Sequence, residues 1–142
     1  MKREDINFIL QKADKNSLRD VYKSIKSKYS VKILQSPTAQ TLLQPVHDPI
    51  SGGEFYAGEV LVTTTIVTVG DSQNRGWAMV QDDQEQLSLY VSVCDGAFGA
   101  GYFTDEIETL VQQTQIEIQK EQNKINQKIN STKVNFDLMS EA

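Results

Sequence analysis

The stretch EFYAGEVLVTTTIVTVG, residues 54–70, decides the fold because it holds a long run of β-branched residues. Valine, threonine and isoleucine dominate from Glu59 to Val69, and these residue types favour a strand. Alternate residues of a strand point to opposite faces, and neither face of this run is polar throughout. The stretch therefore predicts a strand of about eleven residues with both faces covered. A turn over residues 70–76 and a return strand over Trp77–Val80 complete a predicted hairpin.

Two shorter apolar runs precede this hairpin. Val31–Gln35 alternates briefly and predicts a short strand that ends at Pro37. Thr41–Val46 predicts a second short strand, and Pro45 confines it to the edge of a sheet because proline has no N–H to donate. The sequence therefore predicts a small antiparallel sheet.

Helical periodicity surrounds the sheet. Apolar residues at i, i+3, i+4 and i+7 predict helices over residues 4–14 and 17–28, and another that begins after Asp82 and Asp83. Three glycines, Gly96, Gly99 and Gly101, are predicted to interrupt that helix. A further helix is predicted to start near Thr104. Together these patterns predict an α+β fold with N-terminal helices.

The C-terminal part is too long and too polar to be covered by a small domain. A continuous helix over residues 104–130 would reach roughly 40 Å. Such a helix is either an exposed arm or one that packs on another chain. In the segment after it, Val134, Phe136 and Met139 suit docking in a groove, and the alternative is a frayed terminus. We therefore expect one domain over residues 1–142, in which residues 112–142 form a helical arm and a partner-binding tail.

The net charge of −5 is distributed unevenly. Residues 1–35 carry nine lysines and arginines against four acids, whereas residues 36–112 carry eleven acids against one base. The basic segment is either a contact for an anionic partner or a solvated helix face. The acidic centre disfavours binding of nucleic acid or polyphosphate there, because both need cations or clustered amides.

The location of the protein follows from three further patterns. No apolar run approaches the ~20 residues of a membrane-spanning helix. Acids within the first five residues argue against a secretory signal. The single cysteine, Cys94, cannot form an internal disulfide. The sequence therefore predicts a reduced, cytoplasmic protein without membrane contact.

Side chains that could carry chemistry are few and scattered. His47 is the sole histidine, so no histidine cluster can bind a metal ion, and we expect an ordinary surface residue. Cys94 falls on an apolar helix stripe and is expected to be a buried small hydrophobe. Glu59 is expected to hydrogen-bond structurally rather than to act as a general acid or base. The sequence thus predicts no catalytic residue and no metal site, and it favours a subunit over a self-contained enzyme.

Several of these segments together resemble the G subunit of the bacterial carbon–phosphorus lyase system, the PhnG family. The resemblance lies in FYAGEVLVTTTIVTV, in the turn and Gly-aromatic return strand that follow, and in NSTKVNFDLM near the end. In that last segment a valine, an aromatic residue and a methionine recur at the family's spacing. The matching motif positions, to which we assign structural roles, are Phe55, Gly58, Glu59, Thr63, Val67, Asp71, Gly76 and Asp95.

The chain also departs from the family pattern. Thr64 stands where the family usually has an arginine, and Asp82-Asp83-Gln84 replaces a Gly-Arg-Asp sequence. The basic ending of the family's tail is missing as well. The resemblance is therefore to a divergent member.

The resemblance implies a role in phosphonate catabolism. The family's G subunit assembles with the H, I and J subunits and, with the I subunit and an ATPase-like L subunit, helps transfer a phosphonate to ribose C1 of ATP with release of adenine. It implies a transferase subunit that is not catalytic alone and binds no cofactor alone, ATP being a substrate of the complex. Expected contacts are an I-type subunit or a second copy of G. The alternative is a non-enzymatic homo-oligomeric interaction module that has diverged from the family.

Overall fold

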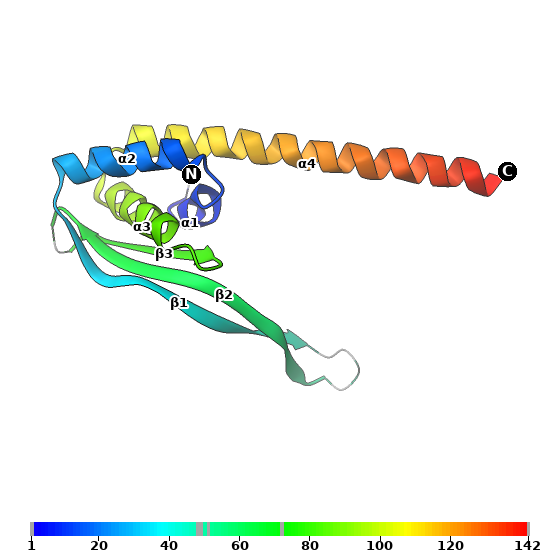
Figure 1. The fold of residues 1–142 in the computed structure, drawn as a ribbon, viewed down its shortest axis with the longest axis horizontal. Coiled ribbons are helices and arrows are strands. Elements are labelled where there is room, and N and C mark those ends of the chain that lie inside the picture. Colours follow the sequence, from blue (N-terminus) through cyan, green and yellow to red (C-terminus); the bar gives the residue numbers. More distant parts are fainter. Residues whose placement is uncertain (1, 48–49, 51, 72, 142) are drawn as a thin grey trace.

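The computed structural model describes residues 2–47, 50, 52–71 and 73–141, without the side chains of residues 44–47, 54–57 and 132–141. Within them, a three-stranded antiparallel sheet of order β1-β2-β3 lies beneath a layer of helices (Figure 1). This arrangement confirms the α+β class and the antiparallel sheet. The elements are α1 (Glu4–Leu10), α2 (Lys15–Lys28), β1 (Val31–His47), β2 (Glu54–Val69), β3 (Arg75–Gln81), α3 (Glu85–Ala100) and α4 (Thr104–Glu141).

The predicted central strand is present as β2, and it is longer than predicted. It starts at Glu54 rather than Glu59, because β1 pairs with it from Val31 as far as His47. On the side facing the helices, Thr63 and Val67 are fully buried. On the other side no helix covers the sheet, and flanking strands shield β2 instead, as in the 2.9 Å hydrogen bond from Gln35 Nε2 to Thr64 Oγ1. Between residues 62 and 68 both faces of β2 are therefore covered as predicted, one by the helices and the other by the flanking strands.

The two short strands predicted before the hairpin are one continuous strand, β1, so the prediction that Pro37 ends a strand is wrong. The pairing of β1 with β2 shifts register on either side of Gln35, and this irregularity accommodates the proline. Because β1 lies at the edge of the sheet, a missing N–H leaves no neighbouring strand without a donor. The edge position predicted from Pro45 is confirmed.

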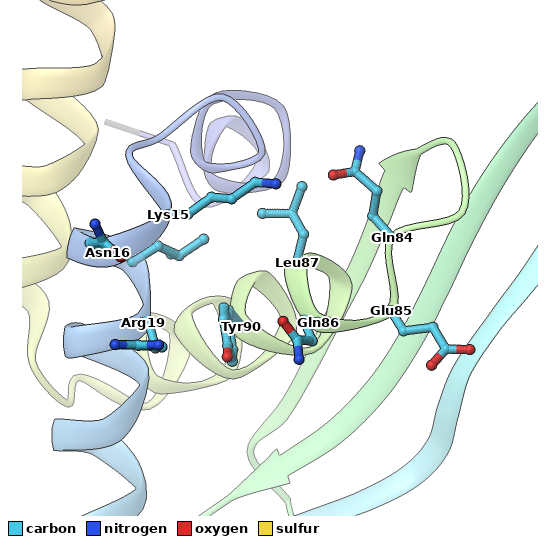
Figure 2. Close-up of a pocket in the computed structure, with 9 residues that line it drawn as sticks. Lys15, Asn16, Arg19, Gln84, Glu85, Gln86, Leu87 and Tyr90 are labelled. Carbon is cyan, nitrogen blue, oxygen red and sulfur yellow. The ribbon is translucent and has the colours of Figure 1, made fainter.

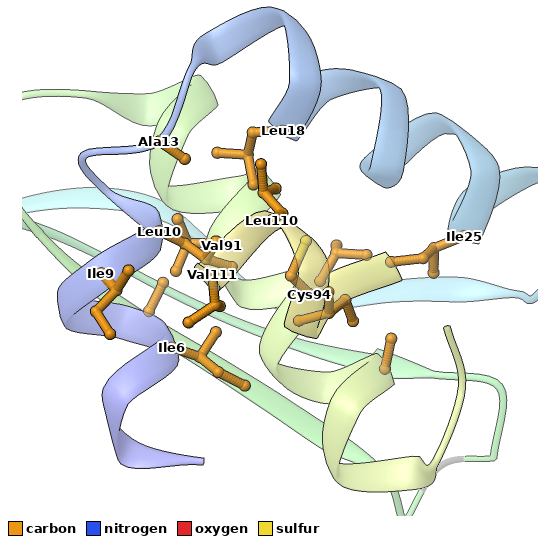
Figure 3. Packing of buried hydrophobic residues seen from close by; sticks show 14 of the residues in the cluster. Ile6, Ile9, Leu10, Ala13, Leu18, Ile25, Val91, Cys94, Leu110 and Val111 are labelled. Carbon is orange, nitrogen blue, oxygen red and sulfur yellow. The ribbon is translucent and has the colours of Figure 1, made fainter. Parts of the chain in front are cut away.

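The hydrophobic core lies between the helices and the sheet (Figure 3). Helix α2 turns Leu18 and Ile25 inward, and Asp14 caps it by accepting a hydrogen bond from Ser17 N at 3.2 Å. Helix α3 crosses the sheet at the centre of this layer and contacts all three strands. Buried residues of all four helices meet here, including Ile6, Leu10, Leu18, Ile25, Val91, Cys94, Leu110 and Val111.

Two predictions about α3 are wrong. Gly96 and Gly99 lie inside the helix, and only Gly101, with φ +82°, ends it in the left-handed conformation. The helix begins at Glu85, so Asp82 and Asp83 belong to the preceding turn rather than to the cap. Gly96 is needed for packing instead: a Cβ added there would lie 3.1 Å from Gly76 Cα on β3. The glycine lets helix and strand backbones touch.

Helix α4 runs without interruption over 38 residues, roughly 57 Å at ~1.5 Å per residue. Its first turns pack on the body, and the rest projects beyond it (Figure 1). The predicted arm is therefore present, but the expected separate tail is part of the same helix. The side chains of Val134, Phe136 and Met139 lie outside the described residues. Across the described helices, none combines the length and apolar character needed to cross a membrane.

The contact between Gly76 and Gly96 yields a stability prediction. In Gly76→Ala the new Cβ would lie 2.6 Å from Gly96 N, so α3 must move away from the sheet. We expect a loss of about 1–3 kcal/mol in the free energy of unfolding, measured by urea denaturation. Gly58→Ala is the matched control, because a Cβ there meets nothing within 4 Å, and it should change stability by less than ~0.5 kcal/mol. Equal effects of the two variants would contradict this packing.

Candidate functional site: a buried aspartate junction and exposed apolar surfaces

Asp95 joins three elements beside the glycine contact. Its carboxylate, only 8% exposed, accepts a hydrogen bond from Trp77 N on β3 at 2.9 Å. The other carboxylate oxygen accepts from Arg3 Nε at 3.1 Å, and the same guanidinium donates to the carbonyl oxygen of Arg75 at 2.5 Å. The buried charge is therefore paired and hydrogen-bonded, as burial of a carboxylate requires. These bonds tie the N-terminus, β3 and α3 together.

Helix α1 seals the free edge of β3 with side chains. Asn7 accepts a hydrogen bond from Met79 N at 2.9 Å and donates one to Trp77 O at 2.8 Å. One turn later, Gln11 accepts from Gln81 N at 3.2 Å. The two amides replace a neighbouring strand and block edge-to-edge pairing. Sequence reasoning missed these residues, and the only signal was their i, i+4 spacing on the polar side of a helix.

Thr63 organises the turn between β3 and α3. Its hydroxyl donates to Asp82 O at 2.6 Å and accepts from Gln84 N at 3.0 Å. Asp82 has φ +68°, a conformation that few non-glycine residues adopt, and the threonine helps to hold it. Thr65 Oγ1 lies 2.6 Å from Ser88 Oγ on α3. In this structure both threonine hydroxyls are engaged in holding α3 on β2.

The structure places the motif residues in three locations. Four of them, Thr63, Val67, Gly76 and Asp95, lie at the interface of sheet and helices. Gly58 and Glu59 are exposed in the far part of β2, where they pair with Gln44 and Leu43. Phe55 belongs to the same part of β2, but its side chain lies outside the described residues. Asp71 is in the β2–β3 turn and accepts a hydrogen bond from Gln73 N at 3.3 Å.

No reactive cluster emerges from the part of the chain that the structure describes. Its histidines, cysteines, aspartates and glutamates form no group of three or more that could hold a metal ion. A groove of about 530 Å³ lies between the starts of α2 and α3 (Figure 2). Its charged lining is Lys15, Arg19 and Glu85, with Tyr90 on one side. This open groove brings together no nucleophile and base.

Two apolar surfaces are exposed. On the outer sheet face, the side without helices, Leu42 and Trp77 are exposed, Trp77 to 45%, and the half-buried Val60, Ile66 and Met79 lie on the same face. The distal ribbon, residues 41–47 and 54–61, is the part of β1 and β2 that extends beyond β3, since β3 pairs with β2 only between Val62 and Thr68. Exposed leucines on the ribbon add to this apolar area: Leu42, Leu43 and Leu61.

Asp95 and Arg3 should contribute unequally to the free energy of unfolding, which provides a test of the aspartate junction. Asp95→Ala leaves Trp77 N–H without its acceptor and should cost about 1–3 kcal/mol in the free energy of unfolding. Arg3→Ala should cost at most about 1 kcal/mol, because Arg3 is 47% exposed and the ion pair is partly screened by solvent. Urea unfolding of both variants measures the difference. If Arg3→Ala costs as much as Asp95→Ala, the bond to Trp77 is not the main contribution.

Cys94 allows a second test. The thiol is completely buried, which confirms the predicted small hydrophobe, and burial, with a smaller effect of the Asp95 charge, raises its pKa to about 12. The thiol therefore stays protonated at pH 8, and reaction with a thiol-specific disulfide reagent should be much slower in the folded protein than in urea. Rapid reaction under native conditions would show that the thiol is accessible.

The sequence model of the family described as phosphonate metabolism protein PhnG matches residues 1–141, which is nearly the whole chain. No curated protein matches the chain significantly. Because the family match covers both the sheet and α4, the chain belongs to the PhnG family of phosphonate metabolism proteins.

Proposed function

We propose that this chain is an accessory subunit of a carbon–phosphorus lyase core complex. In that role it helps an I-type subunit transfer a phosphonate to ribose C1 of ATP, with release of adenine. The family match supports a place in phosphonate metabolism. The catalytic groups would come from the partner, because the described residues of this chain contain no metal-binding cluster and its cysteine is buried. The acidic centre also favours binding of the nucleotide elsewhere in the complex.

The distal ribbon is the observation that carries this proposal. A two-stranded ribbon is at best marginally stable in water unless something packs on it. Here it extends away from the helices (Figure 1) and exposes leucines on both faces, among them Leu43 at 54%. Burial of such residues against a partner would stabilise both the ribbon and the complex. The ribbon also contains Gly58 and Glu59, two of the residues that resemble the family motif.

The outer sheet face extends the same contact surface. Trp77 pairs with Ile66 and Met79 with Thr64, so the side chains of Trp77, Met79 and Ile66 share one face. Tryptophan is enriched among residues that dominate binding energy at protein interfaces. Thr64, where the family usually has an arginine, also belongs to this face. Its side chain is buried and accepts the hydrogen bond from Gln35 Nε2, so it supports this face from within rather than contacting a partner directly.

The experiment is co-expression with a tagged I-type subunit, followed by affinity purification and size exclusion. We expect the wild-type chain to co-purify and Leu43→Asp to reduce its recovery at least about tenfold, because a charge would be placed in the contact. Phe8→Asp is the matched control, since Phe8 is also exposed, at 68%, but lies on α1 on the helical side of the sheet. It should behave as wild type.

Two outcomes would overturn the proposal. The first is a wild-type chain that elutes separately from the I-type subunit. The second is equal recovery of Leu43→Asp and wild type, which would remove the ribbon from the contact. A chain that elutes as an oligomer by itself and never binds the I-type subunit would favour the homo-oligomeric module instead.

A further inference from the structure

The outer edge of β1 pairs with no other strand in the part of the chain that the structure describes. The sheet order is β1-β2-β3, and β1 forms one border of the sheet (Figure 1). The other border, β3, is sealed by hydrogen bonds from the side chains of Asn7 and Gln11. An unpaired edge presents a row of backbone N–H and C=O groups that another strand can bind. Of the two borders, β1 is therefore the one that can accept a strand.

The hydrogen bonds of β2 determine which residues of β1 face this edge. On the β3 side, Leu61 O accepts a hydrogen bond from Asp82 N at 2.8 Å. On the β1 side, Gly70 N donates to Ser30 O at 2.7 Å. Because backbone groups alternate along a strand, odd-numbered residues of β2 face β3 and even-numbered ones face β1. The β1 residues paired with odd-numbered residues of β2 therefore turn their N–H and C=O groups outward, and between residues 38 and 44 these are Ala39, Thr41 and Leu43.

The segment Thr38–Gln44 is an unprotected part of this edge, and we call it the open edge. Register shifts and Pro37 precede it, and a register shift at Pro45 follows it. Prolines and irregular pairing are features that protect an edge from further strands. Within the open edge the register is continuous, and the sequence TAQTLLQ has no proline and no charged residue. Strand addition is therefore confined to residues 38–44.

The charge of the surrounding sequence restricts the kind of strand that fits. Residues 36–70 contain no lysine or arginine, and they contain three acids: Asp48, Glu54 and Glu59. Glu59 is exposed and pairs with Leu43, so the two side chains lie on one face. An added strand would lie about 10 Å from β2, which is two strand spacings. A lysine or arginine placed opposite Leu43 can reach Glu59 over that distance. A second copy of this edge would bring more acids and no such cation, so the charge favours a basic strand from another protein.

We propose that the open edge binds an extended, positively charged segment of the I-type subunit as a fourth strand of the sheet. The backbone groups of Ala39, Thr41 and Leu43 form the hydrogen bonds, and Glu59 attracts a lysine or arginine of the added strand. This mode of binding rests on the function proposed above, because it involves the same partner. It adds the chemical character of the partner's segment and the groups that bind it.

The first test removes one outward N–H group from the full-length chain. Thr41→Pro lacks this donor, and its ring obstructs pairing on the outer side. Its recovery with a tagged I-type subunit should fall at least about tenfold. Thr41→Ala is the matched control, because it keeps the N–H and loses only the side chain, and it should be recovered as wild type. Equal losses in both variants would show that the side chain, and not the backbone, makes the contact.

Urea unfolding of the free chain checks the direction of the backbone groups. The N–H of Thr41 faces away from β2, so Thr41→Pro should leave the urea midpoint close to that of wild type. Gln40 pairs with Val62, an even-numbered residue, so its N–H faces β2. Gln40→Pro should therefore lower the midpoint clearly. If both prolines lower it equally, the outward orientation of Thr41 is wrong and the proposal falls.

The second test reverses the charge that selects the partner's strand. Glu59→Lys should reduce recovery with the I-type subunit at least about fivefold, because it would repel a basic segment. Asp20→Lys is the matched control, since Asp20 is also an exposed acid but lies on α2. It should be recovered as wild type. Unchanged recovery of Glu59→Lys would contradict a basic strand at this edge.

The third test uses amide hydrogen exchange with residue resolution. Binding of the I-type subunit should slow exchange at Ala39, Thr41 and Leu43 at least about tenfold more than at Gln40 and Leu42, whose N–H groups already face β2. A contact made by side chains alone would not produce this alternation. Protection of the outward amides in the free chain at high concentration would instead assign the open edge to a second copy.

The outcomes separate this proposal from the proposed function. A wild-type chain that does not bind the I-type subunit overturns both. A wild-type chain that binds, together with undiminished binding of Thr41→Pro or exchange that does not alternate, overturns strand addition alone and leaves the accessory role in place.

Discussion

The contact between Gly76 and Gly96 is the constraint on which the rest of the structure depends. Without side chains at these positions, the backbone of α3 lies directly on β3. The close contact of the two backbones brings the carboxylate of Asp95, the residue before Gly96, within 2.9 Å of Trp77 N. The carboxylate then attracts Arg3, which fixes the start of α1 along the edge of the sheet. One pair of glycines therefore determines the position of the central helix, a buried charge and the N-terminal helix.

The position of α1 limits where another protein can bind. Because Asn7 and Gln11 occupy hydrogen-bonding groups of β3, that edge offers little for strand addition. Helix α3 covers one face of the sheet, so a partner has access to the opposite face and to the distal ribbon. These are also the places where Trp77 and Leu43 are exposed. The packing that stabilises the body thus directs contacts to one side of the sheet.

Local patterns were enough to predict much of the fold. The β-branched run identified β2, and 3.6-residue periodicity identified α2, α3 and the start of α4, because each element buries a face of its own. Errors arose where tertiary contacts decide. Gly96 suggests a helix break in sequence, yet it is required for close packing inside α3. Pro37 suggests a strand end, yet the edge position of β1 tolerates it.

The candidate site was less predictable for the same reason. Sequence reasoning selected Asp95 only through its resemblance to a family motif, since nothing local shows that its carboxylate meets Trp77 and Arg3. Asn7 and Gln11 escaped notice because amides on a helix usually face solvent, and only the position of β3 gives them partners. The prediction of a separate tail was also wrong. A short alternating pattern cannot be distinguished from the end of a long helix when most positions of that helix are polar.

The distal ribbon and the projecting part of α4 are both connected to the body through helix α3. Helix α3 packs on β2 and β3, which root the distal ribbon, and it also contacts α4. Any displacement of α3 is therefore amplified along the arm: a tilt of about 5° would move a point roughly 40 Å along α4 by about 3–4 Å. Side-chain contacts at an interface tolerate far less movement than this. The ribbon and the arm therefore keep a constant relative orientation only while α3 keeps its position. The glycine contact in the body, although distant from both surfaces, sets their relative geometry.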